Sequence, residues 1–124
     1  CVALKSIEKL ERLIDSKRLE STVAYFGERF DAAFRGHPNV GEIRQRGMAA
    51  AIDLCPDSGR DPWPIDERVG MKVCIEARKQ GLLLRPLLDS ILIVPPLVIS
   101  AEEIDFLFEN LKTALSAAMK KLSN

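Results

Sequence analysis

The sequence contains few histidine, cysteine and aromatic residues, three kinds of side chain that recur in catalytic, metal and ligand sites. Its 124 residues include a single histidine, aromatic residues make up 6%, and the three cysteines lack the spacing of a metal site. Lysine plus arginine and aspartate plus glutamate balance at 18 each, so no excess charge favours nucleic acid as a partner. The apolar runs are too short to span a membrane, and the first residues do not form a signal peptide. We therefore expect a cytoplasmic protein with reduced cysteines, no metal ion, and no nucleic-acid or membrane partner.

Apolar residues nevertheless make up 47% of the chain, which is enough for one domain with a packed core. Apolar side chains three to four residues apart predict a helix over Val2–Asp15, and the same spacing recurs from Leu19 to Phe34. The phase of the pattern slips between the two, so we expect a break near residues 16–17. The chain begins with Cys1 rather than methionine, inside a helical pattern, and we expect it to be part of a longer polypeptide.

The remaining two-thirds of the chain mixes strand and helix signals. Extended structure is predicted over Val40–Leu54, with irregular points at its glycines. A helix follows over Ile65–Gln80, and strands at Leu82–Leu87 and Ile91–Val94 form a hairpin. Ser100 opens a capping-box pattern at the start of a last helix that runs to about residue 122. The predicted fold class is α+β, with a small antiparallel sheet that packs against helices on one side.

Arg85 is the most informative residue, because it is a permanent cation inside the apolar run GLLLRPL. Its position before a proline favours extended backbone. A guanidinium among leucines is costly unless it meets a carboxylate or carbonyl groups. Two interpretations remain open: Arg85 binds the carboxylate of a ligand, or it forms an internal salt bridge with Asp89 or with a glutamate on a covering helix.

The other candidate residues do not form a catalytic pair. His37 lies in a predicted loop without a partner to orient it, so we interpret it as an ordinary loop residue. Cys55 and Cys74 lack a neighbouring histidine or cationic cluster, and we interpret them as small buried hydrophobic residues. Arg44 and Arg46 lie on one face of the predicted strand, either toward an anion or, as we favour, at an exposed sheet edge. Four aspartates lack the spacing of a calcium site and are interpreted as solvated carboxylates: Asp53, Asp57, Asp61 and Asp66.

Three stretches of the chain form an ordered set: EIRQRGMAAAIDL (Glu42–Leu54), ERVGMKVCIEARKQGLLLRPL (Glu67–Leu87) and ILIVPPLVISAEEIDFL (Ile91–Leu107). Together they resemble the C-terminal part of class III pyridoxal-phosphate aminotransferases. The opening CVALKSIEKLERL is similar to the helix that follows the active-site region in these enzymes, so the resemblance covers nearly the whole chain. Within the family, the first two stretches are most similar to members that aminate 8-amino-7-oxononanoate in biotin biosynthesis, with S-adenosylmethionine as the expected amino donor.

The resemblance implies the C-terminal small domain of a fold-type I transferase. Residues 1–36 would be a helical segment leading from a large domain that this chain lacks, and residues 37–124 would be the small domain. The full enzyme would be a cytoplasmic homodimer whose large domain holds pyridoxal 5′-phosphate. The family's Schiff-base lysine, its aspartate facing the pyridine nitrogen and its phosphate cradle have no counterpart here. No catalytic or cofactor-binding residue is therefore expected in this chain, which should be inactive alone.

One functional residue is implied by the resemblance. Arg85 occupies the position of the arginine that receives the substrate carboxylate, where it would orient the acceptor ketone toward the cofactor. Leu88 stands where the family usually has glycine. Because leucine disfavours positive φ, we expect the turn after Arg85 to differ.

Two alternatives remain open for the function. The chain could belong to a class III enzyme that acts on ω-amino acids or diamines, or it could be a free-standing α+β binding module. A domain separated from a larger enzyme exposes apolar surface, and we expect the face formed by Phe26, Phe30 and Phe34 to make this chain self-associate.

Overall fold

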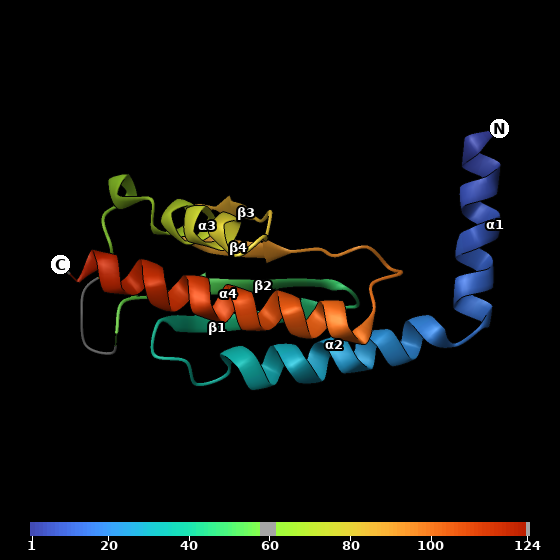
Figure 1. Cartoon of the computed structure of the whole chain (residues 1–124), viewed down its shortest axis with the longest axis horizontal. Helices are drawn as coiled ribbons and strands as arrows, with labels where there is room; N and C mark the ends of the chain where they lie inside the picture. The colour runs from blue at the N-terminus through green and yellow to red at the C-terminus, as the bar shows by residue number, and fades with distance from the viewer. Residues whose placement is uncertain (58–61, 124) are drawn as a thin grey trace.

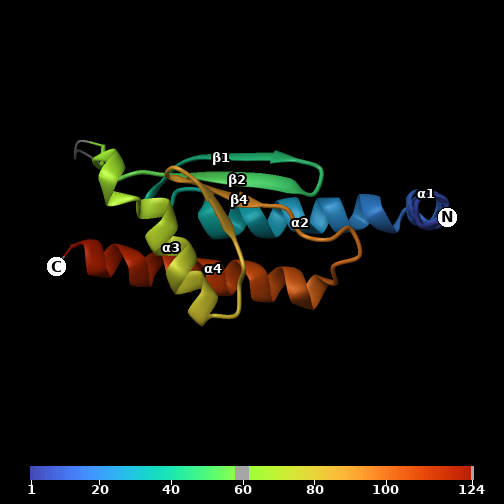
Figure 2. The ribbon, with the colours of Figure 1, turned by 90° about the horizontal axis from the view of Figure 1, so that it is seen from above.

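A four-stranded antiparallel sheet and the helices packed on one of its faces form the body of the molecule (Figure 1). The computed structural model describes residues 1–57 and 62–123. Figure 2 shows α2 and α4 on one side of the sheet, and the predicted α+β class is confirmed. The elements are α1 (Val2–Asp15), α2 (Arg18–Phe34), β1 (Val40–Arg46), β2 (Ala49–Leu54), a 3₁₀ turn η1 (Ile65–Glu67), α3 (Val69–Lys79), β3 (Arg85–Leu87), β4 (Ser90–Ile93) and α4 (Ala101–Leu122).

The sheet has the strand order β1-β2-β4-β3, so that β1 and β3 are its edges. The single extended segment predicted over Val40–Leu54 is wrong, because β1 and β2 form a hairpin. Gly47 and Met48 make its two-residue turn, and Gly47 has a φ of 59°. Glycine at the first turn position supplies the positive φ that tight hairpins require. The predicted irregularity at Gly41 is confirmed by a shift in strand register between Val40 and Glu42.

The core lies between the sheet and the helices, and phenylalanines dominate its centre. Phe26, Phe30 and Phe34 follow one face of α2, and all three are buried. Each ring packs against Phe108 of α4, with centroid distances between 5.1 and 6.0 Å. The expectation that these three phenylalanines form an exposed association surface is therefore wrong. The division of the chain at residue 36 stays a prediction, although α2 shares its core with the elements that follow.

Helix α1 projects away from this body (Figure 1) and has no buried residue. Its bounds agree with the predicted helix, and the predicted break is confirmed at Lys17, whose φ of 56° is left-handed. Ile7 and Ile14, on its apolar stripe, are both 52% exposed. No helix in the described part of the chain is long and apolar enough to cross a bilayer.

The second half of the chain departs from the predicted elements mainly at their starts. The helix predicted from Ile65 begins at Val69 instead, because Arg68 takes a left-handed φ of 48° that separates η1 from α3. The strand predicted over Leu82–Leu87 is shorter, since only Arg85–Leu87 pairs with β4. Helix α4 ends at Leu122, as predicted.

Candidate functional site

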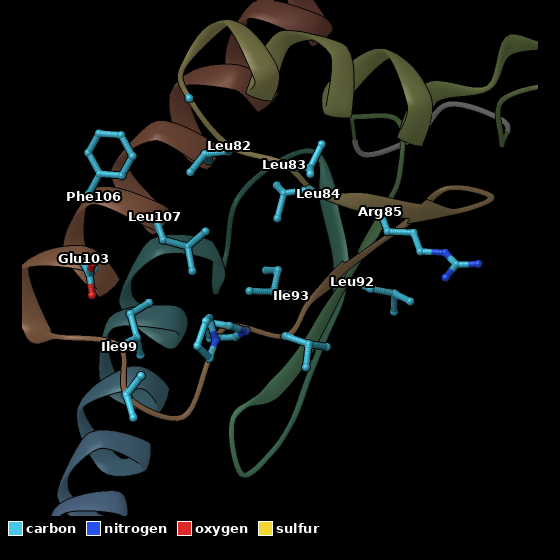
Figure 3. Close-up of a pocket in the computed structure, with 15 residues that line it drawn as sticks. Leu82, Leu83, Leu84, Arg85, Leu92, Ile93, Ile99, Glu103, Phe106 and Leu107 are labelled. Carbon is cyan, nitrogen blue, oxygen red and sulfur yellow. The ribbon is translucent and has the colours of Figure 1, made fainter. Parts of the chain in front are cut away.

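A groove with a volume of about 720 Å³ lies where the segment before β3, strand β4 and the start of α4 meet (Figure 3). Most of its lining residues are apolar. Arg85 is the cation among its lining residues and Glu103 is the anion, and Figure 3 shows Arg85 at the end of the groove away from Glu103. The guanidinium of Arg85 extends away from the leucines of the groove rather than among them. The apolar lining includes Leu83, Leu84, Leu92, Ile93, Phe106 and Leu107.

The sheet register places Arg85 on the face that the helices leave open. Arg85 pairs with Leu92 of β4, and Leu92 pairs with Ala51 of β2. Directly opposed residues of an antiparallel sheet share a face, whereas neighbours along a strand point to opposite faces. Ile91 and Ile93, on either side of Leu92, are buried against the helices. Arg85 and Leu92 therefore face away from the core, and Figure 3 shows both side chains directed away from Ile93.

Arg44 continues the same row of opposed residues, since it pairs with Ala51. Arg44 and Arg85 differ in their ion pairs. Arg44 binds both carboxylate oxygens of Asp53, with 2.8 Å between Nη2 and Oδ1, and lies 3.3 Å from a carboxylate oxygen of Glu42. The hydrogen bond to Asp53 raises the pKa of Arg44. Arg44 is thus an exposed, internally paired residue of the edge strand β1, as favoured from the sequence.

The side chain of Arg85, by contrast, makes no hydrogen bond or ion pair within residues 1–57 and 62–123, and only its backbone pairs with β4. The internal salt bridge with Asp89 is not formed, and an Asp89 carboxylate oxygen instead accepts from the backbone N–H of Gly70 at 3.2 Å. Arg85 is exposed, so the desolvation cost expected for a guanidinium among leucines does not arise. Its planar fork of donors remains available for a carboxylate from outside the described chain.

The turn from β3 to β4 fixes the position of Arg85. Leu88 has a φ of 55°, so the expectation that a leucine would avoid the left-handed region here is wrong. The turn packs on the first residues of α3, where a Cβ on Gly70 would lie 2.2 Å from the Leu88 carbonyl oxygen. Asp89 adds the hydrogen bond to Gly70, and its own carbonyl accepts from Leu54 at 2.8 Å. Glycine at position 70 and the Asp89 contacts together hold β3 against the body.

Asp53 belongs to a polar cluster that the sequence did not reveal. It was interpreted as a solvated carboxylate, but Arg44 and the Ser90 hydroxyl both donate to it. These hydrogen bonds lower the pKa of Asp53, the Arg44 contact having the larger effect. The pairing of β2 with β4 places Asp53 opposite Ser90, and the sequence pattern of one strand does not show which residues oppose it.

The structure does not bring the other candidate residues together. His37 is half-buried, and its Nδ1 accepts from the backbone N–H of Asn39 at 3.2 Å. Burial, with a smaller effect from Lys112, lowers the pKa of His37. Cys74 is buried, as interpreted, and burial raises its pKa, whereas Cys55 is only half-buried. Asp66 is exposed, and Asp61 lies outside the described residues.

The described residues offer no site for a metal ion or a covalently held cofactor. No group of three histidine, cysteine, aspartate or glutamate side chains in residues 1–57 and 62–123 could hold a metal. The groove has no lysine among its lining residues, and every lysine of the chain is exposed on the surface. An aldehyde cofactor needs a positioned lysine amine to form a Schiff base, so these residues do not fit one.

Both the sequence and the fold of the chain are similar to those of known proteins. Residues 1–115 match the family model of the class-III aminotransferases. The adenosylmethionine-8-amino-7-oxononanoate aminotransferase of Geobacter sulfurreducens is 50% identical over 78 residues, covering 62% of this chain and 17% of that protein. The Aquifex aeolicus protein of the same name is 34% identical over 122 residues, covering 98% of this chain and 27% of that protein. The crystal structure of the Methanocaldococcus jannaschii protein of this name is 27% identical, with a TM-score of 0.84 over 93% of this chain and 26% of that one.

Proposed function

Because the chain belongs to the class-III aminotransferase family, we propose that it is the C-terminal small-domain part of an enzyme that converts 8-amino-7-oxononanoate to 7,8-diaminononanoate. The names of the relatives support this acceptor, and they support S-adenosylmethionine as the amino donor. The chain spans only 17% and 27% of the length of the two relatives with this name, so the activity belongs to the longer protein. A cytoplasmic homodimer is part of the same proposal.

The family implies pyridoxal 5′-phosphate, which supplies the electron sink for moving an amino group. We assign its binding to the part of the enzyme outside this chain, because no lysine is positioned in the groove. The contribution of this chain is then to bind and orient the acceptor.

Arg85 carries the proposal, because it is an arginine on an open sheet face without an ion pair in the described residues. A carboxylate accepts two parallel hydrogen bonds from a guanidinium, which fixes the direction of the group as well as its position. Holding the acceptor by this end would place its ketone at a defined distance from Arg85 and so toward the cofactor. The free chain would bind no substrate productively, since the reacting groups lie elsewhere.

The test is Arg85→Ala and Arg85→Lys in the full-length enzyme, assayed with 8-amino-7-oxononanoate and with its carboxyl methyl ester. A charged hydrogen-bonded pair contributes about 1.5–3 kcal/mol, so kcat/KM for the acid should fall roughly 10- to 100-fold in the alanine variant. For the ester, kcat/KM should fall only slightly in the alanine variant, because the ester has no negative charge to pair with Arg85. Arg46→Ala, an exposed arginine on the opposite edge strand β1, is the matched control and should leave both substrates unaffected.

Two results would contradict the proposal. An equal loss of activity with the acid and the ester would give Arg85 a structural role. Failure of the unmodified enzyme to use 8-amino-7-oxononanoate, with efficient turnover of ω-amino acids or diamines, would replace the proposed substrate by the alternative one.

A further inference from the structure

Helix α3 takes the acceptor for its first turn from a distant part of the chain. Arg68, at the N-cap position, makes no capping hydrogen bond with its side chain, and residues 69–72 include no aspartate or glutamate. The first N–H groups of a helix have no partner inside it, and they favour a nearby negative charge. Asp89, in the turn from β3 to β4, meets this need, because its carboxylate accepts from the N–H of Gly70, the second residue of α3. The turn is thereby tied to the start of the helix.

Gly70 also brings the start of α3 against the backbone of β3. A Cβ at position 70 would lie 2.2 Å from the Leu88 carbonyl oxygen and 3.3 Å from the Cβ of Pro86, the residue directly after Arg85. Glycine allows this close approach because it has no Cβ. Pro86 pairs with the buried Ile91 and so faces the helices, whereas Arg85 faces the open side of the sheet. The start of α3 therefore packs on the backbone that carries Arg85.

Strand β3 depends on this turn for its position. It is the edge strand Arg85–Leu87, and within the described part of the chain it pairs only with β4. The side chain of Arg85 has no ion pair in the described residues that would hold the guanidinium in place. A displacement of the turn would therefore move β3, and the guanidinium would move with it.

We propose that Asp89 is a positioning residue for Arg85, because it holds the turn against α3 and thereby fixes the direction in which the guanidinium meets the acceptor carboxylate. The inference rests on the proposed function. Two parallel hydrogen bonds between a guanidinium and a carboxylate require a defined orientation of both groups. A misplacement of about 1 Å can lower a rate roughly 100-fold, so a residue that does not touch the substrate can control its use.

The experiment measures kcat/KM of the full-length enzyme for 8-amino-7-oxononanoate and for its methyl ester, and takes the ratio of acid to ester. Asp89→Ala removes the acceptor for Gly70, and the ratio should fall roughly 10-fold. Asp89→Asn keeps an accepting oxygen and should retain most of the ratio. Both substrates are measured on one preparation, so the fraction of folded enzyme cancels. A loss of stability alone therefore leaves the ratio unchanged.

Asp66→Ala is the matched control, because Asp66 is an exposed aspartate of η1, shortly before the same helix. It should leave the ratio of acid to ester unchanged. An equal loss of kcat/KM for both substrates in Asp89→Ala would overturn the inference. So would a fall of the ratio in Asp66→Ala or in Asp89→Asn that is as large as the fall in Asp89→Ala.

Arg85→Ala, assayed in parallel, separates this inference from the proposed function. Without the guanidinium there is no group to position, so adding Asp89→Ala to Arg85→Ala should not lower the ratio further. A further fall in the double variant, or a fall in Arg85→Ala with none in Asp89→Ala, would refute only the positioning role of Asp89. An unchanged ratio in Arg85→Ala would refute the binding role of Arg85 in the proposed function.

Discussion

Leu88 holds a backbone conformation that its side chain disfavours. Its φ of 55° costs a residue with a Cβ roughly 1–2 kcal/mol, and its side chain is 74% exposed, so burial offsets little of that cost. Leu88→Gly should therefore stabilise the chain by up to about 1 kcal/mol, after the larger entropy of unfolded glycine is subtracted. The midpoint of urea unfolding measures the change. Leu87→Gly, one residue earlier in β3, should destabilise instead, and a loss of stability in Leu88→Gly would contradict the prediction.

At the residue scale, the sequence could identify Arg85 but not its surroundings. A permanent cation in an apolar run can be recognised from the sequence alone, because charge and hydrophobicity are properties of the residues themselves. Whether Asp89 pairs with Arg85 depends on the other contacts of the Asp89 carboxylate. One of these contacts is the backbone N–H of Gly70 in α3, nineteen positions away in the chain. The pairing of Arg44 with Asp53 was hidden for the same reason, since it needs the register of two strands.

The capping box at the start of α4 is an element whose contacts are local, and it is confirmed. The Ser100 hydroxyl accepts from the Glu103 N–H at 3.2 Å, and a Glu103 carboxylate oxygen accepts from the Ser100 N–H at 2.9 Å. Ser100→Ala should destabilise the chain by about 1 kcal/mol, because it leaves a helix-end donor unsatisfied. Thermal unfolding followed by circular dichroism measures this.

Ser116→Ala is the control for the cap. Its hydroxyl donates to the Lys112 carbonyl within the same helix, a contact that favours the helix little. Ser116→Ala should leave the stability of the chain unchanged or raise it slightly. An equal change in stability for Ser100→Ala and Ser116→Ala would show that the capping hydrogen bond does not stabilise the chain.

At the element scale, periodicity predicted helices better than it predicted strands. The bounds of α1 and the end of α4 follow from the spacing of apolar residues. The sequence does not show the β1–β2 hairpin because Met48, the second residue of its turn, and the three alanines that follow form an apolar run without a polar turn residue. The predicted start of α3 is wrong because Arg68 has a left-handed φ. The conformational preference of arginine does not favour that φ, so the sequence alone does not indicate it.

For the whole molecule, the distribution of apolar surface differs from the one predicted. The phenylalanines of α2 fill the core, while apolar residues of α1 and of the groove remain exposed. Burial of α2 requires α4, which follows it by more than sixty residues, so the inner face of α2 could not be distinguished from an interface by its own sequence. The expected self-association should therefore depend on α1.

The apolar stripe of α1 should make this chain associate at high concentration. Ile7, Leu10 and Ile14 lie three and four residues apart and are 52%, 41% and 52% exposed, and the described residues cover none of them fully. Light scattering should show a mass that rises with concentration, and the double substitution Ile7→Glu and Ile14→Glu should return it to that of a monomer. Because α1 has no buried residue, this variant should keep its melting temperature. Lys9→Glu, on the polar face, should associate like the unmodified chain, and a monomeric unmodified chain at every concentration would refute the prediction.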